Sequence, residues 1–125
     1  MATRSAADLA GRRVLVVEDE WFIADEIRAA LERCGAGIVG PAPDVERARE
    51  LAQAGGFDCA VLDINLHGEK VFAFARELKD QGRPIVFATG YGAAFVPPDL
   101  RDAPHFEKPL QFDSFVRAVA RACSP

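Results

Sequence analysis

The chain has 125 residues, of which half are hydrophobic and 27% are charged, and its formal charge is -4. This size and composition are typical of one globular domain that buries its own core, and they exclude several classes. No basic stripe indicates nucleic-acid binding, no apolar run approaches the roughly 18 residues of a membrane helix, and the amino terminus lacks a secretory apolar stretch. We therefore expect a cytoplasmic protein without DNA or membrane partners.

The three cysteines are scattered, and no pair of them has metal-ligand spacing. Cys59 falls inside an apolar run, where a buried thiol behaves as a small hydrophobic group. We expect Cys34, Cys59 and Cys123 to be reduced. Neither His67 nor His105 has a metal-binding partner nearby in the sequence.

Strand-like and helix-like patterns alternate along the chain. Strands are expected at residues 12–17, 38–39, 57–62 and 84–89, and around His105 and Phe106. Helices are expected over the stretch containing Ile23 to Cys34, after an N-cap at Asp44, from Gly68 to Gln81, and from Phe112 to Cys123. Such alternation predicts right-handed crossovers and a parallel sheet covered on both faces.

The segment between the fourth and fifth strands is rich in proline, with Pro97, Pro98 and Pro104. Because proline costs about 3 kcal/mol inside a helix, a fourth helix must be short or irregular, at Ala93 to Val96. We expect residues 1–11 to form a tail and residues 12–125 to form the domain.

Four apolar runs each end in a chemically specific residue. Glu18, Asp19 and Glu20 follow the first run, Asp63 follows the third, Thr89 ends the fourth, and Lys108 follows the fifth. In an open parallel sheet these ends meet at the carboxyl edge, where ligands bind. Metal-binding carboxylates, a carboxylate nucleophile, a hydroxyl and an ammonium together indicate a phosphoryl-transfer site.

Each of these residues also has an ordinary structural explanation. Acids at a helix start complement the macrodipole, which is the explanation we favour for Glu20. An isolated Asp63 caps a loop, a threonine commonly ends a strand, and Lys108 is equally compatible with a solvated charge. The combination of all four is far more specific than any one of them.

With these motifs in place, the chain resembles the receiver domain of two-component response regulators over nearly its whole length. The resemblance implies a flavodoxin-like five-stranded sheet of order 2-1-3-4-5 with five helices, and a cis Lys108-Pro109 peptide. It implies that Asp63 is the phosphoacceptor and that Thr89 and Lys108 contact the phosphoryl group. It also implies Mg²⁺ held by Glu18, Asp19, Asp63 and the backbone carbonyl of Asn65.

The string FATGYG at residues 87–92 resembles the FATGUY group of receivers, many of which are single-domain proteins. The family usually has an aromatic switch residue three positions before the lysine, where this chain has His105, followed by Phe106. Tyr91 is therefore expected to take over the aromatic role. We also expect its ring to shield the acyl phosphate, which would make autodephosphorylation slow.

The resemblance implies signalling rather than enzymatic turnover. A histidine kinase or phosphotransfer protein is the expected donor, and output is expected through contact with a downstream protein, because the chain ends with its last helix. We expect a monomer or weak dimer. Two alternatives stay open: a pseudo-receiver that binds without phosphorylation, and a receiver cut from a hybrid histidine kinase.

Two enzymatic classes fit poorly. A haloacid-dehalogenase-type phosphatase needs a second Asp two residues after the nucleophile, where this chain has Asn65. A dinucleotide-binding protein needs a G-x-G-x-x-G motif after the first strand, and this chain has none.

Overall fold

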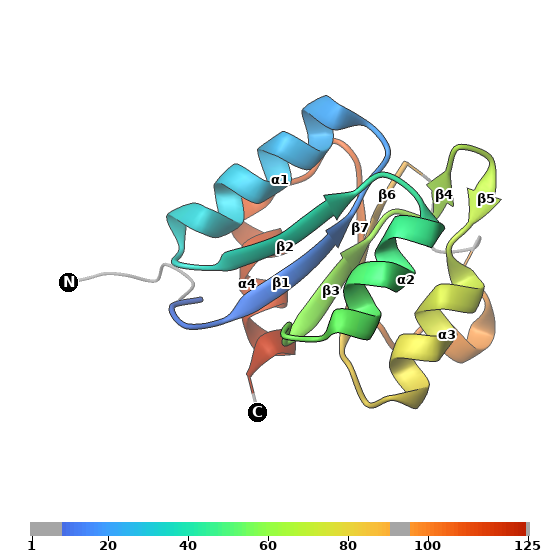
Figure 1. The fold of residues 1–125 in the computed structure, drawn as a ribbon. Helices are drawn as coiled ribbons and strands as arrows, with labels where there is room; N and C mark the ends of the chain where they lie inside the picture. The colour runs from blue at the N-terminus through green and yellow to red at the C-terminus, as the bar shows by residue number, and fades with distance from the viewer. Residues whose placement is uncertain (1–8, 91–95, 125) are drawn as a thin grey trace.

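The computed structural model describes residues 9–90 and 96–124 and contains a five-stranded parallel sheet of order β2-β1-β3-β6-β7 (Figure 1). The strands are β1 (Arg13–Val17), β2 (Gly37–Ala42), β3 (Cys59–Leu62), β6 (Ile85–Thr89) and β7 (His105–Glu107). In chain order this is the predicted 2-1-3-4-5 arrangement. The predicted flavodoxin-like fold is confirmed.

Four α-helices in the described part of the chain cover the two faces of the sheet (Figure 1). They are α1 (Trp21–Arg33), α2 (Val45–Ala54), α3 (Phe72–Asp80) and α4 (Phe112–Cys123). Asp44 caps α2 as predicted, since its side chain accepts a hydrogen bond from the Arg47 amide. None of the described helices has the length and hydrophobicity needed to cross a membrane.

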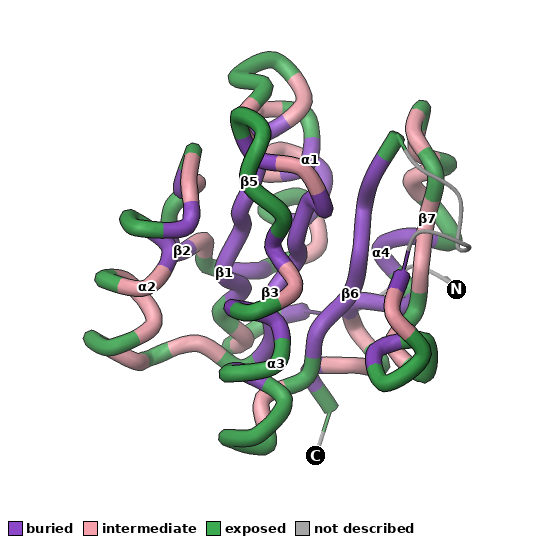
Figure 2. The backbone as a smooth tube through the Cα atoms, turned by 90° about the vertical axis from the view of Figure 1, so that its right-hand side faces the viewer, coloured by how far each residue is buried: buried purple, intermediate pink, exposed green. Residues whose placement is uncertain are grey.

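Alternate residues of each central strand supply two separate cores. Val14 and Val16 of β1 pack with α1 and α4, whereas Leu15 and Val17 pack with α2 and α3. Figure 2 shows the result: the central strands are buried along their length, and exposed backbone lies at the outer surfaces of the helices. Burial on both faces explains why these strands are continuous apolar runs.

The third helix begins later than predicted. A two-stranded antiparallel hairpin, β4 (Asn65–Leu66) and β5 (Glu69–Lys70), overlaps the first residues of the predicted helix, and α3 begins only at Phe72. The turn places His67 at φ 50° and Gly68 at φ 86°, both in the left-handed region. The prediction of a helix from Gly68 was therefore wrong at its amino end.

The proline-rich segment forms little regular structure in its described part. A single 3₁₀ turn, η2 (Pro98–Leu100), lies between β6 and β7 and buries Leu100. The predicted short helix at Ala93 to Val96 falls almost entirely outside the described residues. Tyr91 also lies outside them.

The cysteines differ from expectation. Cys59 of β3 and Cys123 at the end of α4 form a disulfide, with their Cα atoms 5.3 Å apart, while Cys34 is free. The prediction of reduced thiols was thus wrong for this pair. The two residues are 64 positions apart in the sequence and meet only because α4 packs across β3.

Candidate functional site

Backbone pairing between neighbouring strands brings the predicted site residues to one edge of the sheet. The Asp63 amide donates to the Val17 carbonyl at 2.9 Å, which sets Asp63 beside the end of β1. The Lys108 amide donates to the Thr89 carbonyl at 2.8 Å, which joins the ends of β7 and β6 in the same way. The Lys108-Pro109 peptide is cis, as predicted.

Lys108 lies at the centre of an acidic cluster. Its Nζ atom is 2.5 Å from Glu18 Oε1, 3.2 Å from Asp63 Oδ2 and 3.9 Å from Glu20 Oε1. Glu18 and Asp63 are only 3% and 6% exposed, so the Lys108 ammonium contacts both carboxyl groups where little water can reach them. The sequence analysis interpreted Glu20 as an acid at the start of a helix. Its proximity to Lys108 was not predicted.

The burial of these groups changes their protonation equilibria. Burial raises the pKa of the Glu18 carboxyl to about 7; the Asp63 charge adds to this, and the hydrogen bond from Lys108 opposes it. For Lys108, burial alone would lower the pKa, but its contacts with Glu18 and Asp63 raise it above the ordinary value. The ammonium is therefore held in its charged form at neutral pH.

Asp19 is oriented by the hairpin that the sequence did not reveal. Its Oδ2 atom accepts a hydrogen bond of 3.0 Å from the His67 amide, and the His67 ring nitrogen lies 3.8 Å away. Burial favours the neutral carboxyl group and would raise the pKa of Asp19. The hydrogen bond from the His67 amide favours the carboxylate and holds that pKa below its ordinary value. The β4–β5 turn thus keeps one carboxylate of the cluster ionised.

The residues present fit the Mg²⁺ ion that the resemblance implies. Oxygen atoms of Glu18, Asp19 and Glu20 lie within 4.8 Å of one another, and Asp63 shares Lys108 with two of them. Three carboxyl groups lie within 4 Å of the Lys108 ammonium and Asp19 lies beside Glu18, so acidic groups outnumber the single cation, and oxygen donors are what Mg²⁺ prefers. In the same region, the Asn65 side-chain oxygen is buried and has no hydrogen-bond partner among the described residues.

A comparison with known protein families identifies the family of this chain. The model of the response regulator receiver domain matches residues 14–119 of the chain. The chain belongs to this family.

Individual relatives agree with this assignment. The receiver is 42% identical over 82 residues to the sensory transduction protein LytT of Bacillus cereus, covering 63% of this chain and 33% of LytT. It is 30% identical over 117 residues to the transcriptional regulatory protein PdtaR of Mycobacterium tuberculosis, covering 90% of this chain and 57% of PdtaR. The chain therefore spans between a third and just over half the length of these curated relatives.

The same fold is present in a solved structure of similar length. The solution structure of SdrG from Sphingomonas melonis Fr1 matches the receiver with a TM-score of 0.79 and 33% sequence identity. The match covers 98% of this chain and 100% of SdrG.

The other predicted residues of the receiver lie on its last two strands. The Thr89 side chain is buried at the end of β6, next to Lys108 in the strand pairing. Phe106 packs its ring against Phe115 of α4, with centroids 5.6 Å apart. His105 is half-buried, and its Nε2 atom is buried without a hydrogen-bond partner in the described part of the chain.

Two exposed aromatic residues border the acidic cluster of the receiver. Trp21 and Phe22 open α1 directly after Glu20 and are 78% and 68% exposed. Trp21 lines a hollow of about 330 Å³ together with Glu18, Asp19, Pro41 and Pro43. Trp21 and Phe22 are the large hydrophobic residues that are exposed in the described part of the chain.

Proposed function

We propose that this receiver accepts a phosphoryl group on Asp63 from the phosphohistidine of a histidine kinase or phosphotransfer protein. The observation that carries the proposal is the shared contact of Lys108 with buried Glu18 and Asp63 at the carboxyl edge of the sheet. This arrangement presents a carboxylate nucleophile beside a fixed positive charge. Catalysis then consists of positioning and electrostatics.

In the proposed step, an Asp63 carboxylate oxygen attacks phosphorus as the bond from phosphorus to the donor imidazole nitrogen breaks. The electron pair stays on that nitrogen, which takes a proton from solvent, and an acyl phosphate forms on Asp63. Lys108 balances the charge of the transferred group. The Thr89 hydroxyl is proposed to donate to a phosphoryl oxygen.

Glu18, Asp19, Asp63 and the Asn65 carbonyl are the proposed holders of Mg²⁺. When bound, the ion neutralises the carboxylates that would otherwise repel an incoming phosphoryl group. The exposed pair Trp21 and Phe22 is the surface that we expect the phosphodonor protein to cover, since it adjoins the acidic cluster.

Finer features of the receiver are also proposals. The FATGYG string supports membership of the FATGUY group, with Tyr91, His105 and Phe106 carrying the switch and Tyr91 slowing autodephosphorylation. The phosphorylated group is proposed to shift an existing equilibrium in the 90–106 segment toward a form that contacts a downstream protein. We further propose a cytoplasmic monomer or weak dimer that signals without DNA contact and without turnover as an enzyme.

The test of the proposed function is incubation with acetyl phosphate and Mg²⁺, followed by intact mass measurement. The wild-type chain should gain the mass of one phosphoryl group, and the Asp63→Asn variant should gain none. Asp58→Asn is the matched control, because Asp58 is exposed at the other end of β3 and should leave labelling unchanged. An unlabelled wild-type chain would favour a binding module instead.

Magnesium binding is predicted to be visible in Trp21 fluorescence, because Trp21 is the one tryptophan of the chain and shares a hollow with Glu18 and Asp19. Titration with Mg²⁺ should give a saturable change. Asp19→Asn should weaken the apparent affinity by about tenfold or more. Asp25→Asn, in the same hollow but paired with Arg28, should change it by less than about twofold; equal effects of the two variants would contradict the assignment.

A further inference from the structure

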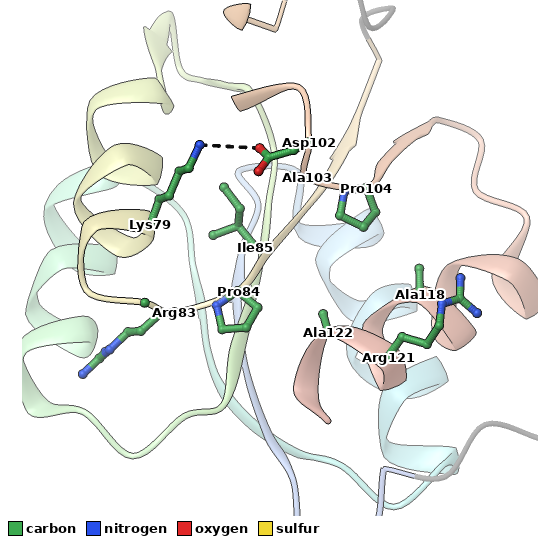
Figure 3. Close-up of a pocket in the computed structure, with 11 residues that line it drawn as sticks. Lys79, Arg83, Pro84, Ile85, Asp102, Ala103, Pro104, Ala118, Arg121 and Ala122 are labelled. Atoms are coloured by element: carbon green, nitrogen blue, oxygen red, sulfur yellow. Dashed lines mark ion pairs between the residues drawn. The ribbon is translucent and has the colours of Figure 1, made fainter. Parts of the chain in front are cut away.

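A second hollow lies at the opposite end of the sheet from Asp63. It has a volume of about 450 Å³ and is bordered by the end of α3, the start of β6, residues 102–104 before β7, and α4 (Figure 3). We call it the basal hollow. Its lining includes residues of α3 and α4, the helices that cover opposite faces of the sheet.

The floor of the basal hollow is apolar and partly exposed. Pro84 and Pro104 are exposed, while Ile85, Ala118 and Ala122 lie deeper. None of these side chains offers a hydrogen-bonding group, and the alanines of α4 leave room for a larger side chain. The floor therefore suits one apolar side chain supplied from outside.

The rim of the basal hollow is basic, although the chain as a whole carries a charge of -4. Its lining includes three cationic residues, Lys79, Arg83 and Arg121, and one acid, Asp102. The Lys79 ammonium pairs with Asp102 at 3.5 Å, as the dashed line in Figure 3 marks. That ion pair neutralises one cation and the single acid of the rim.

The two arginines have no carboxylate partner within the described residues. The Arg83 guanidinium stacks on the Phe57 ring at 4.4 Å and donates to the Ala52 carbonyl, so it is held in place while still charged. Arg121 is exposed on the last turn of α4. The two side chains lie on opposite sides of the hollow in Figure 3, and both extend outward from it, so their charges flank the hollow rather than point into it.

We propose that the basal hollow is a docking site for an acidic segment of a partner protein, with one large apolar side chain inserted between carboxylates on either side. An apolar centre surrounded by charged groups, with arginine prominent, is the anatomy of a protein interface. Charge complementarity selects an acidic partner rather than a basic one. The proposal does not depend on phosphorylation of Asp63, because it rests on the lining residues alone.

The test uses the full chain, labelled with ¹⁵N, and three short acetylated peptides. The first has a central leucine between pairs of glutamates, the second replaces leucine by serine, and the third replaces the glutamates by lysines. The first peptide should give saturable shifts of the Ile85, Ala103, Ala118 and Ala122 amides. The other two should bind at least about fivefold more weakly.

Two variants of α4 provide the matched comparison. Arg121→Glu should weaken binding of the first peptide by about fivefold, whereas Arg117→Glu, the same change one turn earlier and outside the hollow, should change it by less than about twofold. Ala122→Leu fills the hollow without changing charge, so it should weaken binding as well. Its amide spectrum reports whether the fold is intact.

Several results would overturn the proposal. Shifts centred on Trp21 and Phe22 would place the acidic peptide elsewhere, and absence of saturable shifts would remove the site. Equal binding of the serine peptide would show that the apolar floor is not used. Equal losses in Arg121→Glu and Arg117→Glu would show general charge attraction only.

Discussion

Replacing Lys108 by methionine should destabilise the metal-free protein by about 2–3 kcal/mol and slow labelling by acetyl phosphate by about a hundredfold. Methionine keeps an unbranched apolar stem but removes the ammonium that lies 2.5 Å from Glu18 and 3.2 Å from Asp63. The two buried carboxylates then face each other without a cation. The slower labelling follows because the transferred group loses the charge that balances it.

The stability part is measured by urea unfolding at pH 8, once with a chelator and once with saturating Mg²⁺. Mg²⁺ should reduce the difference in free energy of unfolding between wild type and variant, since a bound cation restores positive charge to the acidic cluster. Arg117→Met removes an exposed cation from α4 and should alter the free energy of unfolding by no more than about 0.5 kcal/mol.

The two readouts of the Lys108 variant are independent of each other. A variant that is as stable as wild type without metal would show that the ammonium does not compensate buried charge. A variant that is destabilised but labelled at the wild-type rate would show that Lys108 is structural and does not serve the transferred group. The proposed role requires both effects.

Much of this site could be predicted because its residues occupy strand ends. Three apolar runs suit strands of a parallel sheet that is covered on both faces: Val14 to Val17, Cys59 to Leu62 and Ile85 to Thr89. In such a sheet, the residue that follows or ends each run lies at the carboxyl edge. The position of Glu18, Asp63 and Thr89 therefore followed from local pattern and general topology. No long-range contact had to be known.

The features that were missed depend on contacts between distant segments. Residues 68–70, in the second half of the hairpin, were taken as the start of a helix because Val71, Phe74 and Leu78 fall on one helical face, and that spacing does not show where the helix begins. The useful signal was His67-Gly68, a pair that suits left-handed turn positions. Without that turn, the hydrogen bond from the His67 amide to Asp19 could not be foreseen.

The cysteine pair and Glu20 were missed for the same physical reason. Cys59 is a strand residue and Cys123 a helix residue, and neither sequence context shows which helix packs on which strand. Glu20 was correctly placed at the start of α1, but its distance to Lys108 depends on how the β1–α1 turn approaches β7. Pairings across the sheet are tertiary information.

Replacing Glu18 by glutamine should stabilise the metal-free protein at pH 8 by about 2–3 kcal/mol. Burial raises the pKa of Glu18 from 4.5 to about 7, so between these pH values the folded protein binds more protons than the unfolded chain. The free energy of unfolding of the wild type therefore falls as pH rises through this window. Glutamine has the shape of the protonated acid and does not titrate, so the variant lacks this loss.

The measurement is urea unfolding from pH 5 to pH 8 in the presence of a chelator. The difference between variant and wild type should be smallest near pH 5 and largest at pH 8, and Glu26→Gln, an exposed acid of α1, should show no such trend. Saturating Mg²⁺ should raise the free energy of unfolding of the wild type more than that of the variant, because the ion binds the carboxylate and not the amide. A difference that is independent of pH would mean that Glu18 is already ionised at pH 5, and that Lys108 alone compensates its burial. The receiver would then hold this carboxylate without a cost in stability that depends on pH between 5 and 8, and the raised pKa of Glu18 in the metal-free site would be wrong.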